Sequence, residues 1–285
     1  MNTILYATDY SKNSETALRY AYHLSLKLNA KLEVIHIFNY PKVLENEIQE
    51  DAQNFEPDAF KRNRNRLKTF CKDYLDETSE RIKTDAVKNN SVVDGILAKA
   101  KEIDPLFIIM GAKGISKIKD FFIGNTTKRL MEKAAYTILS IPYSDTVKDI
   151  KSIVYATALE NDDINAICRL VDIAKPLDAM IKVVHISTKK EYDGEAQMEW
   201  FKEMFYNKLL YDKISFDIIF NDDIINSLTD YAEKNQADLI AMLERNNNGF
   251  LNNFLNKNKI KLMNDYGKYP LMVFNKSKCL SLNLS

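Results

Sequence analysis

A run of glycines in the first half of the chain carries the residue types best suited to binding chemistry. Gly111 and Gly114 frame a short segment, nine residues follow, and Gly124 then precedes Asn125 and Thr126. Glycine adopts positive φ freely and lets backbone N–H groups approach a ligand closely. A helix beginning near residue 126 would add unpaired N–H groups and the positive end of its dipole. The spacing therefore predicts a phosphate-binding site.

The flanking residues place this run at the end of a strand. An apolar strand at 106–110 precedes the glycines and a helical stretch at 128–135 follows them. Asp9 directly follows another apolar strand, at 3–8. In a doubly wound sheet, ligands bind at the carboxyl ends of the strands where the winding reverses. We therefore expect Asp9 to face the glycines and hold a ribose hydroxyl or a divalent metal, with Lys113 within reach.

The chain repeats itself. Residues 4–37 align without a gap against 153–186, which places His36 on His185, and residues 106–110 align against 238–242. The second copy is shorter, and the loss falls within 188–230. Each copy has an ordinary domain length. We therefore expect two domains, residues 1–146 and 147–285.

Strands and helices alternate within each copy, which predicts an α/β fold. The first copy shows apolar strand patterns at 3–8, 31–38, 82–87, 106–110 and 137–142, and helical spacing at 14–28, 58–78, 92–100 and 126–135. Such alternation favours a parallel, doubly wound sheet with right-handed crossovers.

Composition limits the classes of function. Hydrophobic residues make up 46% of the chain and charged residues 28%, with a formal net charge of zero. With a net charge of zero, no overall electrostatic attraction to nucleic acid or to a membrane surface is expected. No apolar segment is long enough to span a membrane. The three scattered cysteines, the start of the chain and the lack of a signal peptide favour a cytoplasmic protein. We interpret the basic run at 61–66 as a solvated helix face, with a partner surface as the alternative.

The glycine spacing matches neither a Walker A motif nor a Gly-x-Gly-x-x-Gly dinucleotide loop. It resembles the universal stress protein family, whose ATP-binding members carry Gly-x-x-Gly, nine residues, then Gly followed by Ser or Thr. The resemblance extends to residues 4–11 and 34–38 and covers both copies, as in the tandem form of the family. It implies two five-stranded parallel sheets of order 3-2-1-4-5. The last strands, which lie at sheet edges, would pair as an internal pseudo-dimer.

The resemblance also implies a site for ATP or another adenine nucleotide, with Mg carried by the nucleotide. Asp9 would meet the ribose or metal, the backbone near Ile37 would read adenine, and the glycine loops would hold the phosphates. Asn125 departs from the family's Ser or Thr, but its amide can still donate. The residues expected at the nucleotide are Ala7, Thr8, Asp9, Ile37, Met110, Gly111, Lys113, Gly114, Gly124, Asn125 and Thr126.

The second copy departs further from the motif. Asp9 aligns with Ala158, Gly111 with Leu243, Gly114 with Asn246 and Gly124 with Asn256. Side chains at these positions stand where backbone would have to approach phosphate. We therefore expect nucleotide in the first domain only.

These observations favour a non-catalytic nucleotide sensor in stress response, acting on an unidentified protein partner. The alternatives are a scaffold that binds no nucleotide and an enzyme of weak ATPase or adenylating type. No Ser/His/Asp or Cys/His set supports nucleophilic catalysis, so no catalytic residue is predicted. We expect His36 and His185 to pack or bond to loops and His23 to be structural. The sequence leaves further association into a homodimer open.

Overall fold

The computed structural model describes residues 2–39, 52–75, 80–112, 125–144, 146–189, 193–244 and 269–276. Strands and helices alternate along both halves, as the sequence predicts. In the first half they are β1 (Thr3–Ala7), α1 (Lys12–Lys27), β2 (Lys31–Phe38), α3 (Ala52–Tyr74), β3 (Ile82–Lys88), α4 (Val92–Ile103), β4 (Ile108–Gly111), α5 (Asn125–Lys133) and β5 (Ile138–Ile141). In the second half they are β6 (Ser152–Ala156), α6 (Asn161–Leu177), β7 (Met180–Ser187), α7 (Gly194–Tyr206), β8 (Ile214–Phe220), α8 (Ile224–Lys234), β9 (Leu239–Glu244) and β10 (Leu271–Asn275).

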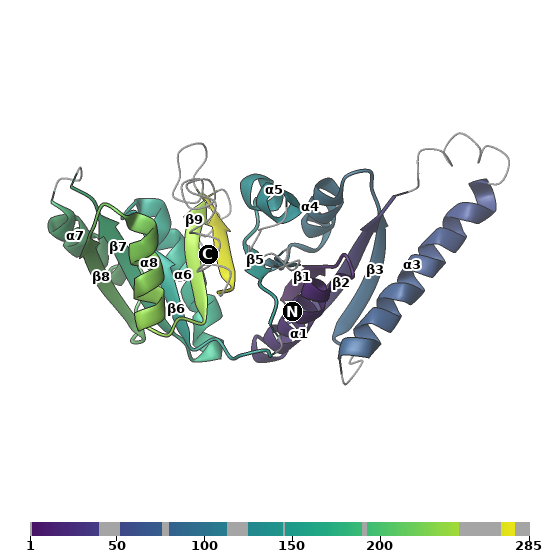
Figure 1. Ribbon diagram of the computed structural model, residues 1–285, viewed down its shortest axis with the longest axis horizontal. Helices are drawn as coiled ribbons and strands as arrows, with labels where there is room; N and C mark the ends of the chain where they lie inside the picture. Colours follow the sequence, from purple (N-terminus) through teal and green to yellow (C-terminus); the bar gives the residue numbers. More distant parts are fainter. Residues whose placement is uncertain are drawn as a thin grey trace.

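The strands of the described residues form one ten-stranded sheet, in the order β3-β2-β1-β4-β5-β10-β9-β6-β7-β8. Each half has the expected order 3-2-1-4-5, and its neighbouring strands pair in parallel. The two halves meet where β5 and β10 pair antiparallel, with Met272 opposite Leu139 (Figure 1). The predicted edge pairing is therefore confirmed, and it merges the two five-stranded sheets into a continuous one.

A hydrophobic core covers each face of this sheet. On one face α1, α3, α6 and α7 contribute side chains such as Phe70 and Phe201 to a core with the strand residue Tyr6. On the other face α4, α5 and α8 contribute side chains such as Ile96 to a core with the strand residue Leu5. Both cores run through the two halves, because the β5–β10 pairing keeps equivalent helices on the same side. Strands covered on both faces explain the nearly continuous apolar runs in the sequence.

The segment that links the halves is bound along α1. Thr16 Oγ1 donates to the Ser144 carbonyl at 2.9 Å, the Lys148 backbone N–H donates to Tyr20 Oη at 3.4 Å, and His23 Nε2 lies 2.6 Å from Asp149. The three α1 residues recur at helical spacing and therefore share one face. The structural role predicted for His23 is confirmed, since this side chain fixes the linker.

The structure locates the length difference between the repeats. Strands β1 and β2 correspond to β6 and β7 at an offset of 149 positions, whereas β3 and α4 correspond to β8 and α8 at an offset of 132. The missing 17 residues therefore lie between β7 and β8, where the 13-residue α7 replaces the 23-residue α3. The basic run on α3 is only partly a solvated face, because Arg64 pairs with Asp85 and Arg66 stacks over Tyr10.

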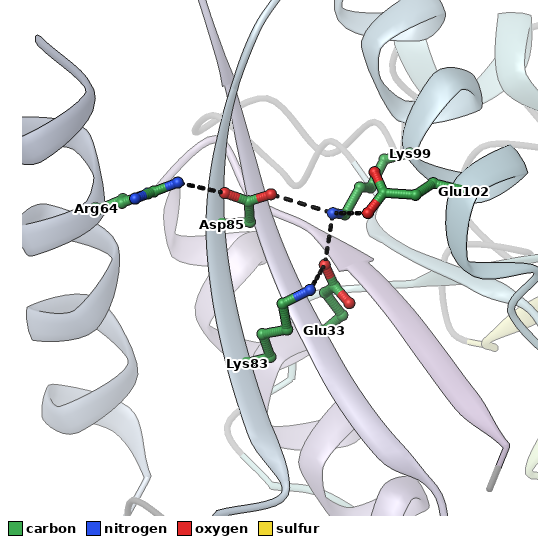
Figure 2. A network of polar contacts seen from close by, with 6 residues as sticks. All are labelled: Glu33, Arg64, Lys83, Asp85, Lys99 and Glu102. Atoms are coloured by element: carbon green, nitrogen blue, oxygen red, sulfur yellow. Dashed lines mark hydrogen bonds and ion pairs between the residues drawn. The ribbon is translucent and has the colours of Figure 1, made fainter. Parts of the chain in front are cut away.

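A polar network ties α4 to strands β2 and β3 of the first half (Figure 2). The Lys99 side chain is only 4% exposed, and its ammonium lies 2.9 Å from Glu33, 3.1 Å from Asp85 and 3.0 Å from Glu102. Burial alone would lower the pKa of Lys99, but the hydrogen bonds to these carboxylates outweigh it and raise the pKa. Lysine is therefore charged here and holds three acidic groups together. Lys83 and Arg64 complete the network at its outer side.

In the second half, the equivalent helix α8 contacts its strands through other residues. Tyr231 stands where the first half has Lys99, and its hydroxyl donates to Asp217, the counterpart of Asp85, at 2.5 Å. Lys182 replaces Glu33 and donates to Asn235 at 2.7 Å. In the first repeat α4 is thus anchored to the edge strand β3, and in the second α8 is anchored to the edge strand β8, although the charged residues differ.

Removing the central cation of this network tests its contribution to stability. Lys99→Met removes the buried cation between Glu33, Asp85 and Glu102 and leaves Glu33 with only the exposed Lys83 as a partner, so the free energy of unfolding should fall by about 3 kcal/mol. Lys101→Met, on the exposed side of the same helix, should change it by less than about 0.5 kcal/mol. Urea denaturation followed by circular dichroism measures both. Equal effects of the two substitutions would show that Lys99 has no special role.

Candidate functional site

The winding of the sheet reverses between β1 and β4. Strand β1 pairs with β2 on one side and with β4 on the other, so that Ala7 lies opposite Ile35 and Met110. The chain leaves β1 and β4 toward opposite faces of the sheet, and a crevice opens beyond their carboxyl ends. The topology therefore places Thr8 and Asp9 next to Gly111, as the sequence predicts.

The turn after β1 presents the Asp9 carboxylate. The Ser11 backbone N–H and the Ser14 hydroxyl both donate to Asp9 Oδ1, at 3.0 and 2.6 Å. Partial burial would raise the pKa of Asp9, but the hydrogen bonds from Ser11 and Ser14 outweigh it and hold this pKa below its usual range. Asp9 is exposed and ionised near neutral pH. Both of these hydrogen bonds go to Oδ1.

Tyr10 forms the corner of this turn in a left-handed conformation, with φ of 61°. A bulky residue at positive φ costs about 1–3 kcal/mol, which the surrounding contacts must offset. Its backbone N–H donates to Thr8 Oγ1 at 3.0 Å, and its ring packs on His36 with centroids 4.5 Å apart. Arg66 of α3 lies 4.0 Å above the same ring. The stack therefore connects α3 to the site.

His36 bonds to the loop that follows β1. Its Nδ1 lies 2.9 Å from the Thr8 carbonyl, and His185 makes the same contact with Thr157 at 3.0 Å. Burial lowers the pKa of His36, and the Arg66 charge lowers it further. The imidazole is therefore neutral at pH 7 and donates to the carbonyl. The structural role predicted for both histidines is confirmed.

Strand β2 extends beyond the end of β1 and leaves backbone groups facing the crevice. The Ile35 carbonyl accepts from the Thr8 N–H at 2.9 Å, so the backbone groups of Ile37, two residues on, face the same side. Among the described residues β1 offers them no hydrogen-bond partner. Ile37 thus presents one donor and one acceptor past the last β1 residue, while its side chain is buried against α4.

Gly111 allows the end of β4 to lie against the first turn of α1. A Cβ at this position would lie 3.1 Å from the Asn13 carbonyl group and 3.2 Å from the Ser14 backbone nitrogen. Because backbone atoms cannot easily move away, a larger residue would push the helix start outward. Glycine is therefore required for packing, in addition to any contact with phosphate.

The other predicted site residues divide into two groups. Met110 is buried beneath the crevice, and Asn125 and Thr126 form the first turn of α5, where unpaired N–H groups gather. Lys113, Gly114 and Gly124 lie outside the described residues. Among the described residues no group of three His, Cys, Asp or Glu side chains could hold a metal.

The second repeat closes the equivalent crevice with its own side chains. Leu243 stands in place of Gly111, is 2% exposed and joins the core beneath α6. Asp163 stands in place of Ser14 and is fully buried. Its carboxylate accepts from Tyr155 Oη at 2.8 Å, Thr157 Oγ1 at 3.0 Å and the Ala158 N–H at 3.1 Å.

Each repeat thus has one carboxylate in this region, but at a different position. The first carries Asp9 on the turn and Ser14 on the helix, whereas the second carries Ala158 and Asp163. Sequence reasoning found the loss at position 158 and missed the gain at 163, which the gapless alignment of Ser14 with Asp163 could have signalled. The turn itself persists, since Leu159 also has a left-handed φ of 60°. The strained turn alone therefore does not distinguish the two sites.

Comparison with known proteins agrees with this architecture. Residues 1–142 match the model of the Universal stress protein family. The chain belongs to this family by its first half, and the second half repeats the fold in tandem. No curated protein sequence is similar enough to match.

Solved structures reproduce the whole tandem fold. A universal stress protein from Archaeoglobus fulgidus is 16% identical, with a TM-score of 0.67, and the match covers 96% of this chain and 98% of that one. A putative universal stress protein from Pseudomonas aeruginosa is 13% identical, with a TM-score of 0.59 and coverages of 99% and 95%. At these identities the likeness concerns the fold. None of the described helices is long and apolar enough to cross a bilayer.

The Ser14 hydroxyl offers a direct test of the Asp9 environment. Ser14→Ala removes the shortest hydrogen bond to this carboxylate, so the pKa of Asp9 should rise, which a ¹³C NMR pH titration measures. The lowered pKa means that Asp9 stabilises the fold above its unfolded pKa and loses this contribution as pH falls through its folded pKa. Ser25→Ala, a buried serine of the same helix that bonds to Tyr22, should leave the Asp9 titration unchanged. An unaltered Asp9 pKa in Ser14→Ala would contradict the geometry.

Proposed function

We propose that this chain is a universal stress protein that binds ATP or another adenine nucleotide in its first repeat only. It would act in the cytoplasm as a non-catalytic sensor, and an unidentified protein partner would respond to its occupancy. The observation that carries this proposal is the difference between the repeats at equivalent positions. The first has the exposed carboxylate of Asp9 beside Gly111, and the second has the buried side chains of Asp163 and Leu243 in the region equivalent to this site.

Each part of an adenine nucleotide has a matching group in the first repeat. The Ile37 N–H and C=O face the crevice as an adjacent donor and acceptor, which suits the hydrogen-bonding edge of adenine. Asp9 is ionised and acceptor-only, so its Oδ2 would accept from a ribose hydroxyl. Thr8, between them, holds the turn.

The phosphates would lie over the end of β4 and the start of α5. Gly111 adds no side chain there, and the first-turn N–H groups of Asn125 and Thr126 favour negative charge. We expect Lys113, Gly114 and Gly124 to complete this part of the site. A magnesium ion would be held chiefly by the phosphates, with Asp9 as the nearest carboxylate.

A sensor needs a route from the site to the surface. The stack of Arg66 on Tyr10 and of Tyr10 on His36 runs from the turn beside Asp9 to α3. A ligand that binds more tightly to one arrangement of this turn would shift the population of α3 positions. This arrangement supports a regulatory role without any chemical step.

Nucleotide binding can be measured by isothermal titration calorimetry with MgATP. The wild-type chain should bind one ATP per chain rather than two. Asp9→Ala removes a charged acceptor and should weaken binding about tenfold or more. Gly111→Leu, which copies the second repeat, should abolish binding.

Asp94→Ala serves as the matched control, because it removes an exposed aspartate of the same repeat near the start of α4. It should leave the affinity unchanged. Wild-type protein that binds no ATP, or binds two, would refute the proposal. Phosphate release above background during the titration would instead favour the weak ATPase.

A further inference from the structure

The second repeat contains a cavity that the nucleotide proposal does not use. It has a volume of about 340 Å³ and lies at the carboxyl ends of β7 and β8, beside the first turn of α7. Figure 1 shows these elements at the end of the sheet opposite α3. Its lining includes Ser187, Asp193, Gly194, Glu195, Phe220 and Asp222. This volume is at the lower end of the range for small-molecule sites.

The first repeat has filled the corresponding place. Phe38, the counterpart of Ser187, packs edge-on against Phe60 of α3 with ring centroids 5.0 Å apart. Ala59 and Ala86 complete this small cluster. The second repeat has a serine in place of the aromatic ring and a shorter helix. The cavity is therefore a specific difference between two copies of the same fold.

The floor of the cavity carries a buried hydroxyl. Ser187 is 3% exposed, and its Oγ makes no hydrogen bond within the described part of the chain. The start of α7 lies directly on it, since a Cβ at Gly194 would be 2.7 Å from this oxygen. As part of the lining, this hydroxyl can accept a hydrogen bond from a ligand or donate one to it.

The charges around the cavity determine which ligands fit. Its described lining includes three acidic residues, Asp193, Glu195 and Asp222, and one lysine, Lys189, whose ammonium lies 3.6 Å from Asp222. Asp193 Oδ1 accepts from the Ala196 N–H at 3.2 Å, so the start of α7 is already capped by a carboxylate. Among the described lining residues the net charge is negative, which favours a cation over an anion such as phosphate.

The wall of the cavity suits an organic cation. Phe220 is 62% exposed and belongs to the lining, so its ring can contact the hydrocarbon part of a ligand or the cation itself. We propose that this cavity binds an aliphatic amine. The ammonium group would lie between Asp193 and Glu195 and donate to Ser187 Oγ, while the hydrocarbon chain would lie along Phe220.

The only tryptophan of the chain reports on this cavity. Trp200 lies on α7 and lines an adjoining hollow with Ala196, Gln197 and Asp193, and Asp193 borders both spaces. Titration of the full chain with 1,4-diaminobutane at constant ionic strength should change the Trp200 fluorescence along a saturable curve. Asp9→Ala should not alter this curve, which separates amine binding from nucleotide binding.

Two variants test the assignment of the site. Ser187→Phe copies the first repeat, fills the cavity and should abolish the saturable response. Glu195→Gln neutralises one carboxylate of the lining and should weaken binding about two- to fivefold. Glu203→Gln makes the same change on an exposed residue of the same helix, outside the lining, and should have no effect.

Several results would overturn the proposal. These are a wild-type titration that never saturates, an equal weakening by Glu195→Gln and Glu203→Gln, and full binding by a folded Ser187→Phe variant. Equal weakening by Glu195→Gln and Glu203→Gln would show that the negative charge of α7 as a whole attracts the amine, without a specific site.

Discussion

The antiparallel pairing of β5 with β10 is the constraint on which the rest of the structure depends. A sheet of order 3-2-1-4-5 leaves its last strand with unpaired N–H and C=O groups, which is an aggregation hazard. Here each repeat covers the exposed edge of the other, with Val273 opposite Ile138 and Leu271 opposite Ser140. The pairing makes both hydrophobic cores continuous.

Within each repeat the close contact between a strand end and a helix start decides what the crevice can hold. In the first repeat Gly111 lets β4 approach the backbone of Asn13 and Ser14, and Ser14 turns the Asp9 carboxylate outward. In the second, Asp163 points inward and is bonded by Tyr155 and Thr157. The moved carboxylate, together with Leu243 in place of Gly111, therefore distinguishes the packed second repeat from the first.

The repeats also differ where no ligand is involved, which shows how far the fold tolerates substitution. The Lys99 network and the Tyr231–Asp217 bond anchor equivalent helices with different charges. Phe38 fills a space that Ser187 leaves open. Packing requires that polar groups near the edge strands be paired and that apolar volume be filled, but several residue sets satisfy these requirements.

The sequence by itself determined the repeat and the alternation of strands and helices, because periodicity is a local property of the chain. Its resemblance to the universal stress protein family supplied the strand order, and the switch-point rule predicted that Asp9 lies beside Gly111. The sequence also predicted that the last strands pair. Only the tertiary structure showed the burial of Asp163, the cation at Lys99, the linker bound along α1 and the cavity at Ser187. Each of these depends on which side chains from distant elements meet, and no pattern along one segment contains that information.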